Sequence, residues 1–173
     1  GVVGVISPWN YPLNLALEPT LEALAAGNRV MIKPSELTPR FSELLAQTVA
    51  EAFPPDVLRV VTGGVELAQE FAALPWDHLF FTGSTRVGRE VARTASANLT
   101  PVTLELGGKS PTIVSASADL ERAAASLVMA KALNAGQTCI APDYVLVHEN
   151  HRTAFAQAFS RALQKQYPEL GET

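Results

Sequence analysis

Cys139 could carry out covalent catalysis, because a cysteine thiolate is a strong nucleophile. It ends the segment Asn-Ala-Gly-Gln-Thr-Cys at 134–139, whose small residues would let a ligand approach the backbone closely. The alternative is a buried structural cysteine, the commoner fate of a lone cysteine. Cys139 is the only cysteine in the chain, which excludes an internal disulfide and a multi-cysteine zinc site. We therefore expect a reducing compartment, the cytoplasm.

Glu105 could serve as a general base. It lies in the run Thr-Leu-Glu-Leu-Gly-Gly-Lys at 103–109. We expect a carboxylate in so apolar a run to be poorly solvated, with its pKa raised toward the range of a general base. The alternative is a structural ion pair with Lys109.

The segment 83–88, Gly-Ser-Thr-Arg-Val-Gly, could bind phosphate, because a glycine turn between a strand and a helix aims backbone N–H groups at an anion. Its candidate residues are Gly83, Ser84 and Gly88. The spacing does not match the dinucleotide fingerprint G-x-G-x-x-G. The alternative is that Ser84 and Thr85 only cap the helix.

Lys33 and Glu36 follow a second predicted strand. In a dinucleotide-binding fold, an acidic group near this point binds the hydroxyls of the adenosine ribose. The alternative is that Lys33 is solvated and Glu36 belongs to the first turn of the next helix.

Short β-branched runs alternate with amphipathic ones over the first 107 residues. The runs predict strands at 2–6, 29–32, 58–61, 78–81 and 102–106, and helices at 13–26, 38–53, 65–73 and 85–97. This alternation predicts an α/β fold: a Rossmann-like parallel sheet with helices on both faces. Ligands bind outside the carboxyl ends of such strands, and nearly all the residues named above lie there.

The sequence pattern changes after residue 108. Beyond it, strands are predicted at 111–114 and 144–148 and helices at 120–133 and 151–166. We place a domain boundary at this point. Residues 1–107 would be a partial dinucleotide-binding domain, and residues 108–173 the start of a second α/β domain, the catalytic domain with the nucleophile. The chain lacks an initial Met and a natural ending signal, so we expect both ends to be cuts and the isolated piece to be inactive.

Composition argues against several classes of function. The net charge is −4 and no basic run occurs, which disfavours nucleic-acid binding. No uncharged apolar segment reaches the ~18 residues that span a bilayer. The three histidines, His78, His148 and His151, have no metal-ligand spacing, so we expect no metal site.

Five motifs resemble the aldehyde dehydrogenase superfamily, in the order found in that family. They are Pro-Trp-Asn-Tyr-Pro at 8–12, Lys-Pro-Ser-Glu-Leu-Thr-Pro at 33–39, Phe-Thr-Gly-Ser at 81–84, Leu-Glu-Leu-Gly-Gly-Lys at 104–109 and Gly-Gln-Thr-Cys at 136–139. The resemblance implies that Cys139 is the nucleophile, that Glu105 is the general base and that the Asn10 amide helps to bind the oxyanion. It places Trp9, Gly83 and Ser84 near the pyrophosphate of the cofactor and Lys33 and Glu36 at the adenosine ribose. Gly88 and Leu106 are further cofactor-binding residues.

The resemblance also implies a reaction. An aldehyde is oxidised to a carboxylate through a cysteine thiohemiacetal and a thioester, with NAD as cofactor and NADP tolerated. Val-Thr-Gly-Gly at 61–64 and Cys-Ile-Ala-Pro-Asp-Tyr at 139–144 resemble the class 3 and coniferyl aldehyde dehydrogenase branch. This indicates aromatic or medium- to long-chain aldehydes, coniferyl aldehyde among them, and a homodimer. Two alternatives are a thioester-transfer enzyme that uses coenzyme A or phosphate and a non-catalytic nucleotide-binding module.

Overall fold

The computed structural model describes residues 1–169, and the chain divides into two compact units, Gly1–Leu106 and Gly107–Thr173. The division lies next to Gly107–Gly108, where the texture of the sequence changes.

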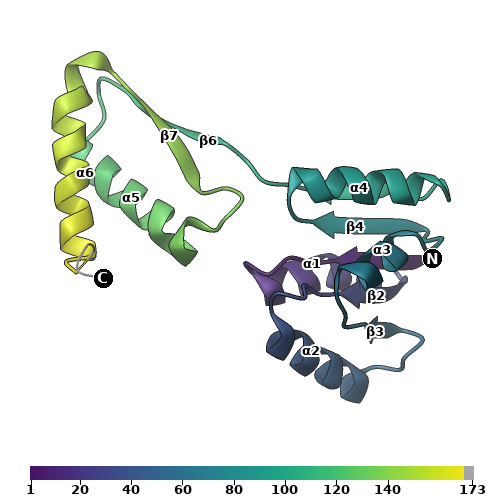
Figure 1. Ribbon diagram of the computed structural model, residues 1–173. Coiled ribbons are helices and arrows are strands. Elements are labelled where there is room, and N and C mark those ends of the chain that lie inside the picture. The colour runs from purple at the N-terminus through teal and green to yellow at the C-terminus, as the bar shows by residue number, and fades with distance from the viewer. Residues whose placement is uncertain (170–173) are drawn as a thin grey trace. The chain divides into compact units, whose positions relative to one another are not determined.

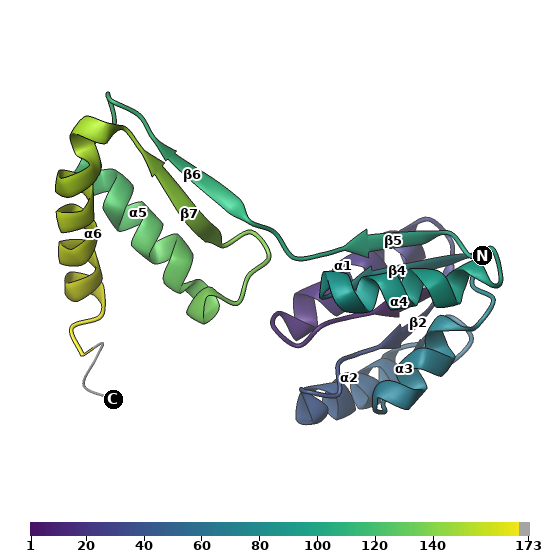
Figure 2. The same ribbon diagram turned by 45° about the horizontal axis from the view of Figure 1, so that its top comes forward.

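The first unit is built on a five-stranded parallel sheet with the strand order β3-β2-β1-β4-β5. Its strands are β1 (Val2–Ile6), β2 (Arg29–Lys33), β3 (Leu58–Val60), β4 (His78–Thr82) and β5 (Val102–Glu105), as Figures 1 and 2 show. The chain runs outward from β1 to β3 on one side, then crosses over to β4 and β5. The sheet therefore has a reversal of strand order between β1 and β4.

Four helices cover the two faces of this sheet. They are α1 (Pro12–Ala25), α2 (Pro39–Ala52), α3 (Val65–Ala72) and α4 (Thr85–Ser96). Helices α1 and α2 pack against β1, β2 and β3 in one core around Val5 and Ile32, while α3 and α4 pack on the other face around Leu79. The predicted α/β fold with helices on both faces is confirmed, and the element bounds lie within two residues of those expected.

Helix α1 ends in a Schellman motif, the common C-terminal turn of helices. The Gly27 N–H donates to the Leu24 carbonyl at 2.9 Å and the Asn28 N–H to the Ala23 carbonyl at 3.0 Å. Gly27 has a φ of 80°, a left-handed conformation that glycine adopts without steric cost.

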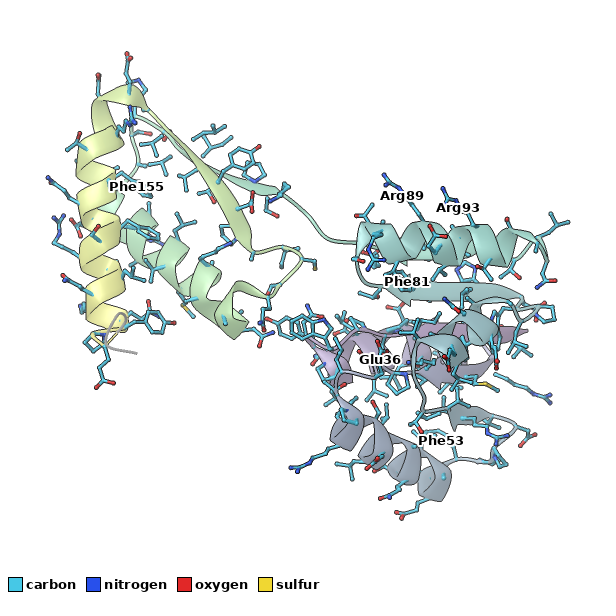
Figure 3. All side chains as sticks on the ribbon, in the orientation of Figure 1. Glu36, Phe53, Phe81, Arg89, Arg93 and Phe155 are labelled. Atoms are coloured by element: carbon cyan, nitrogen blue, oxygen red, sulfur yellow. The ribbon has the colours of Figure 1, made fainter. Side chains whose placement is uncertain are left out.

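The second unit pairs two parallel strands, β6 (Ser110–Val114) and β7 (Pro142–Val147), with two helices, α5 (Leu120–Ala132) and α6 (Arg152–Gln166). Short 3-10 turns follow α5 at Leu133–Gly136 and precede α6 at Glu149–His151. One small core joins these elements around Val114, Leu127 and Phe155. Figure 3 labels Phe155.

Candidate active site

The strand order reverses between β1 and β4, and open α/β sheets bind ligands outside the carboxyl ends of the strands at such a point. The two strands are direct neighbours, with Ile6 opposite Phe81. Trp9 and Asn10 follow β1, and the segment that begins at Gly83 follows β4. Trp9 is exposed and Asn10 is half-buried. The residues predicted to bind cofactor and oxyanion thus flank one edge of the sheet.

The turn from β4 into α4 is shaped by glycines that make room for neighbouring side chains. A Cβ on Gly83 would lie 2.5 Å from the Phe81 ring, and one on Gly88 would lie 2.8 Å from the Leu106 side chain. The Ser84 hydroxyl caps α4 by accepting from the Val87 N–H at 3.3 Å. The capping alternative therefore describes Ser84 correctly. The other N–H groups at the start of a helix have no partner within the helix.

Lys33 is buried, with 1% of its side chain exposed, so the alternative of a solvated lysine is wrong. Its Nζ donates to the Pro34 carbonyl oxygen at 2.9 Å and to Glu36 Oε2 at 3.2 Å. Glu36 is 40% exposed and is labelled in Figure 3. It precedes α2 and does not belong to its first turn.

The pKa of Glu36 is lowered from the ordinary glutamate value. The main cause is a hydrogen bond from its own backbone N–H, and the hydrogen bond and positive charge of Lys33 act in the same direction. Partial burial opposes these effects by raising the pKa. Glu36 is therefore an ionised acceptor at neutral pH.

A pocket of about 320 Å³ lies beside this ion pair, lined by Glu36, Ser42, Thr62 and Gly63 among others. Ser7, at the carboxyl end of β1, is buried, and its Oγ has no hydrogen-bond partner among the described residues. Hydroxyl and carboxylate acceptors at this edge fit the ribose of a dinucleotide, whose hydroxyls need such partners. Sequence reasoning missed Ser7, although a polar residue at the end of a buried strand is a usable signal.

Glu105 is the last residue of β5, which is an edge strand of the sheet. Its backbone is fixed by pairing with Thr82 and by the Gly83 N–H, which donates to the Glu105 carbonyl oxygen at 3.0 Å. The side chain is exposed, so the expectation of a poorly solvated carboxylate is wrong. The ion-pair alternative fails as well, because Lys109 pairs with Asp143 at 3.1 Å.

Cys139 is a free, exposed cysteine in the second unit, so the alternative of a buried structural cysteine is wrong. It lies at the second position of a tight turn, in which the Ala141 N–H donates to the Thr138 carbonyl oxygen at 3.1 Å. Three consecutive left-handed residues precede this turn: Asn134, Ala135 and Gly136, with φ values of 50°, 56° and 77°. Left-handed conformations in non-glycine residues concentrate at functional sites.

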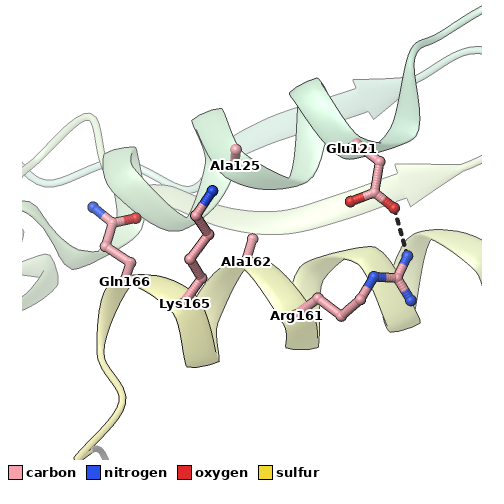
Figure 4. Close-up of a pocket in the computed structure, with 6 residues that line it drawn as sticks. All are labelled: Glu121, Ala125, Arg161, Ala162, Lys165 and Gln166. Carbon is pink, nitrogen blue, oxygen red and sulfur yellow. Dashed lines mark hydrogen bonds and ion pairs between the residues drawn. The ribbon is translucent and has the colours of Figure 1, made fainter.

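Figure 4 shows a pocket of about 650 Å³ between α5 and α6, crossed by an ion pair between Arg161 and Glu121. None of the predicted site residues lines it. Within residues 1–169, no cluster of three or more His, Cys, Asp or Glu side chains could hold a metal, and no helix is long and apolar enough to cross a bilayer.

Comparison with known proteins gives a consistent result. Residues 1–170 match the Aldehyde dehydrogenase family. A probable coniferyl aldehyde dehydrogenase of Pseudomonas aeruginosa is 54% identical over 172 residues, which cover 99% of this chain and 36% of that protein. The chain thus spans about a third of the length of the curated relatives it matches.

Solved structures agree with the sequence matches. The substrate-bound state of Staphylococcus aureus AldH is similar with a TM-score of 0.92 and 46% identity, over 96% of this chain and 36% of that one. A Mycobacterium tuberculosis aldehyde dehydrogenase complexed with NAD+ is similar with a TM-score of 0.86 and 41% identity, over 95% of this chain and 34% of that one. The resemblance carried by the five motifs is therefore confirmed, and the chain belongs to the aldehyde dehydrogenase family.

Proposed function

We propose that this chain supplies the cofactor-binding edge and the nucleophile of an enzyme that oxidises an aldehyde to a carboxylate with NAD(P)+. The observation that carries the proposal is the exposed free thiol of Cys139 on a tight turn. The first unit, with the reversal of strand order between β1 and β4, is the dinucleotide-binding part. The second unit is the beginning of the catalytic part.

The Cys139 thiolate adds to the aldehyde carbon and forms a covalent adduct, whose oxyanion is held by the Asn10 amide and the Cys139 backbone N–H. NAD(P)+, when bound, accepts the hydride that this oxidation releases. Glu105 then takes a proton from the water that hydrolyses the resulting thioester. The exposed position of Glu105 supports this role, because the carboxylate must reach a water molecule.

Residues at the carboxyl edge of the sheet would hold the cofactor. Lys33 and Glu36 hold the adenosine ribose, and their ion pair supports this assignment because it fixes an ionised acceptor beside a pocket. Trp9, Gly83 and Ser84 would approach the pyrophosphate, and Gly88 and Leu106 would also contact the cofactor. NAD is the preferred cofactor, because a carboxylate that accepts from the 2′-hydroxyl repels a 2′-phosphate.

The substrate is an aromatic or medium- to long-chain aldehyde, and coniferyl aldehyde is the first compound to test. The 54% identity with a protein called a probable coniferyl aldehyde dehydrogenase supports this choice. The enzyme acts in the cytoplasm as a homodimer, which sedimentation of the intact protein tests.

The nucleophile is tested with Cys139→Ser in the intact protein. A serine hydroxyl is a far weaker nucleophile at neutral pH, so turnover of coniferyl aldehyde should fall roughly 10³-fold or more. The dissociation constant for NAD+, measured by fluorescence titration, should stay unchanged. Turnover near the wild-type value would remove Cys139 from the mechanism.

The general base is tested with Glu105→Gln. This variant should give a burst of NADH and then stall, because the thioester forms but is not hydrolysed. Mass spectrometry of the stalled protein should find the acyl group on the Cys139 peptide. If neither burst nor steady state changes, Glu105 has no part in deacylation.

The cofactor assignment is tested by comparing kcat/KM for NAD+ and NADP+ in wild type and in Glu36→Gln. Removing the negative charge should shift the preference toward NADP+ by ~1–3 kcal/mol. Glu43→Gln is a matched control, since Glu43 lines the same pocket without contacting Lys33. An unchanged ratio in Glu36→Gln would mean that the ribose does not bind here.

A further inference from the structure

Gly108 lies against the backbone of Cys139 in the second unit. A Cβ built on Gly108 would lie 2.8 Å from the Cys139 carbonyl oxygen and 3.9 Å from its carbonyl carbon. Real Cβ atoms almost never approach an atom so closely, and the neighbour here is backbone, which cannot rotate away as a side chain could. The close approach therefore requires glycine at position 108.

Space is the reason that glycine is needed here. Gly108 does not have a positive φ, so its backbone conformation suits any L-residue. The same holds for the preceding residue, Gly107, where a Cβ would meet no heavy atom within 4 Å. A Cβ would therefore press on the Cys139 backbone at position 108 and not at position 107.

The contacted oxygen belongs to the central peptide of the turn that presents the thiol. Cys139 and Ile140 are the two middle residues of the turn closed by the Ala141 N–H. The central peptide of a tight turn has two orientations, roughly 180° apart, which distinguish type I from type II turns. Type II requires a positive φ at the third residue.

Ile140 blocks the second orientation. Its φ is not positive, and a β-branched residue is strongly disfavoured in that region. Because its side chain is 76% exposed, it contributes little to the core. If a Cβ at position 108 pushed the Cys139 carbonyl away, the peptide could not relax by turning over.

The chain on either side of the turn is also held. Upstream, the left-handed run from Asn134 to Gly136 leads out of α5. Downstream, Pro142 begins β7 and is the register partner of Ser110 in β6, two residues after Gly108, and the register shifts between Ser110 and Pro111. The turn that contains Cys139 is therefore connected closely to α5 on one side and to β7 on the other.

We propose that Gly108 is a positioning residue for Cys139: together with Ile140, it holds the Cys139–Ile140 peptide in one orientation and so fixes the thiol and the Cys139 N–H. This inference rests on the proposed role of Cys139 as nucleophile. A displacement of about 1 Å at a reacting group can lower a rate by up to about 100-fold. Gly108 thereby sets the reactivity of the thiol without touching the substrate.

The test uses Gly108→Ala and Gly107→Ala in the intact protein. Iodoacetamide alkylation of Cys139 is followed by peptide mass spectrometry between about pH 6 and pH 10. In Gly108→Ala kcat should fall about 10- to 100-fold, the alkylation rate constant should fall across the profile, and the dissociation constant for NAD+ should stay unchanged. In Gly107→Ala the alkylation profile should match wild type.

Gly108→Ala could fail to fold, so a second variant is needed. In Gly108→Ala/Ile140→Gly, glycine at position 140 lets the displaced peptide turn over, which should restore the unfolding midpoint. Alkylation should stay slow, because the peptide is now held in the wrong orientation. If alkylation recovers together with stability, Gly108 is only a packing residue and the proposal fails.

The outcomes separate this inference from the proposed function. Wild-type alkylation in Gly108→Ala would overturn the positioning role, even if Cys139→Ser is inactive. Slow alkylation in Gly108→Ala would show that Gly108 positions the thiol, even if Cys139→Ser proved to be active. That second result would refute the proposed function and, with it, the catalytic meaning of Gly108.

Discussion

The ion pair between Lys33 and Glu36 joins a buried ammonium to a carboxylate that remains 40% exposed. Because of this difference in burial, removing the Glu36 carboxylate and removing the Lys33 ammonium should have different effects on stability. Removing Glu36 leaves a buried charge with one fewer partner, whereas removing Lys33 leaves a carboxylate that water and its own backbone N–H still solvate. We therefore expect Glu36→Gln to destabilise the first unit more than Lys33→Met.

The magnitude follows from the burial of each end. Exposed ion pairs contribute about 0–1 kcal/mol, and breaking a fully buried pair costs about 3–5 kcal/mol. With one end buried and one partly solvated, Glu36→Gln should cost about 1–2 kcal/mol. Lys33→Met should cost about 0–1 kcal/mol, because methionine fills much of the same space without an uncompensated charge.

The cost of Glu36→Gln should depend on pH. The folded-state pKa of Glu36 is lowered, so its stabilisation is present above the ordinary glutamate pKa of about 4.3. The stabilisation is lost as the pH falls through the lower folded value, where the carboxyl group becomes protonated. The difference between Glu36→Gln and wild type should therefore be largest near neutral pH and shrink in acid.

Urea unfolding followed by tryptophan fluorescence measures both effects in the first unit. The chain has two tryptophans, and both Trp9 and Trp76 lie in that unit. Trp76 is buried and packs on Phe71 with ring centroids 4.6 Å apart, so its emission should report unfolding. A loss in Lys33→Met equal to or greater than that in Glu36→Gln would refute the reasoning from burial.

Three further substitutions test local backbone features. Gly27→Ala should destabilise the first unit by about 1 kcal/mol in the same assay, because alanine is strained at a φ of 80°; Gly27→Asn should cost less. Leu99→Asn should stabilise the same unit by about 0.5–1 kcal/mol, since Leu99 has a φ of 54° and is 91% exposed. Asp119→Ala should lower the free energy of unfolding of the second unit by about 1 kcal/mol, because Asp119 accepts from two N–H groups at the start of α5. Unfolding followed by circular dichroism measures this loss. Asp119→Asn, which keeps an acceptor, should cost less than Asp119→Ala, and equal losses would contradict the capping argument.

The sheet of the first unit could be predicted because the residue types within and next to each element mark where it begins and ends. Val2–Ile6 is a short β-branched run, and its span agrees with the structure. Gly27–Asn28 signals the end of α1 by residue type alone. Prolines at positions 12 and 39 open α1 and α2, where the missing N–H is not needed.

Properties that depend on long-range packing could not be predicted in this way. Glu105 was expected in apolar surroundings because its sequence neighbours are apolar. Its strand β5 lies at the edge of the sheet, however, and Glu105 is its last residue. Lys33 shows the opposite effect: a lysine after a strand usually reaches water, but this one folds back onto the Pro34 carbonyl oxygen and Glu36.

The glycines of the candidate site differ in how strictly each position requires glycine, because a Cβ at each position would meet different kinds of atoms. A Cβ on Gly83 or Gly88 would meet side chains, the Phe81 ring and the Leu106 methyl, which can shift by rotation. A Cβ on Gly108 would meet the Cys139 carbonyl oxygen, which is a backbone atom. The peptide that carries this oxygen cannot turn over easily, because Ile140 would then need a positive φ. Alanine at Gly108 should therefore be tolerated less well than alanine at Gly88, although both contacts measure 2.8 Å. The mobility of the neighbouring atom, more than the distance to it, decides how strictly each position requires glycine.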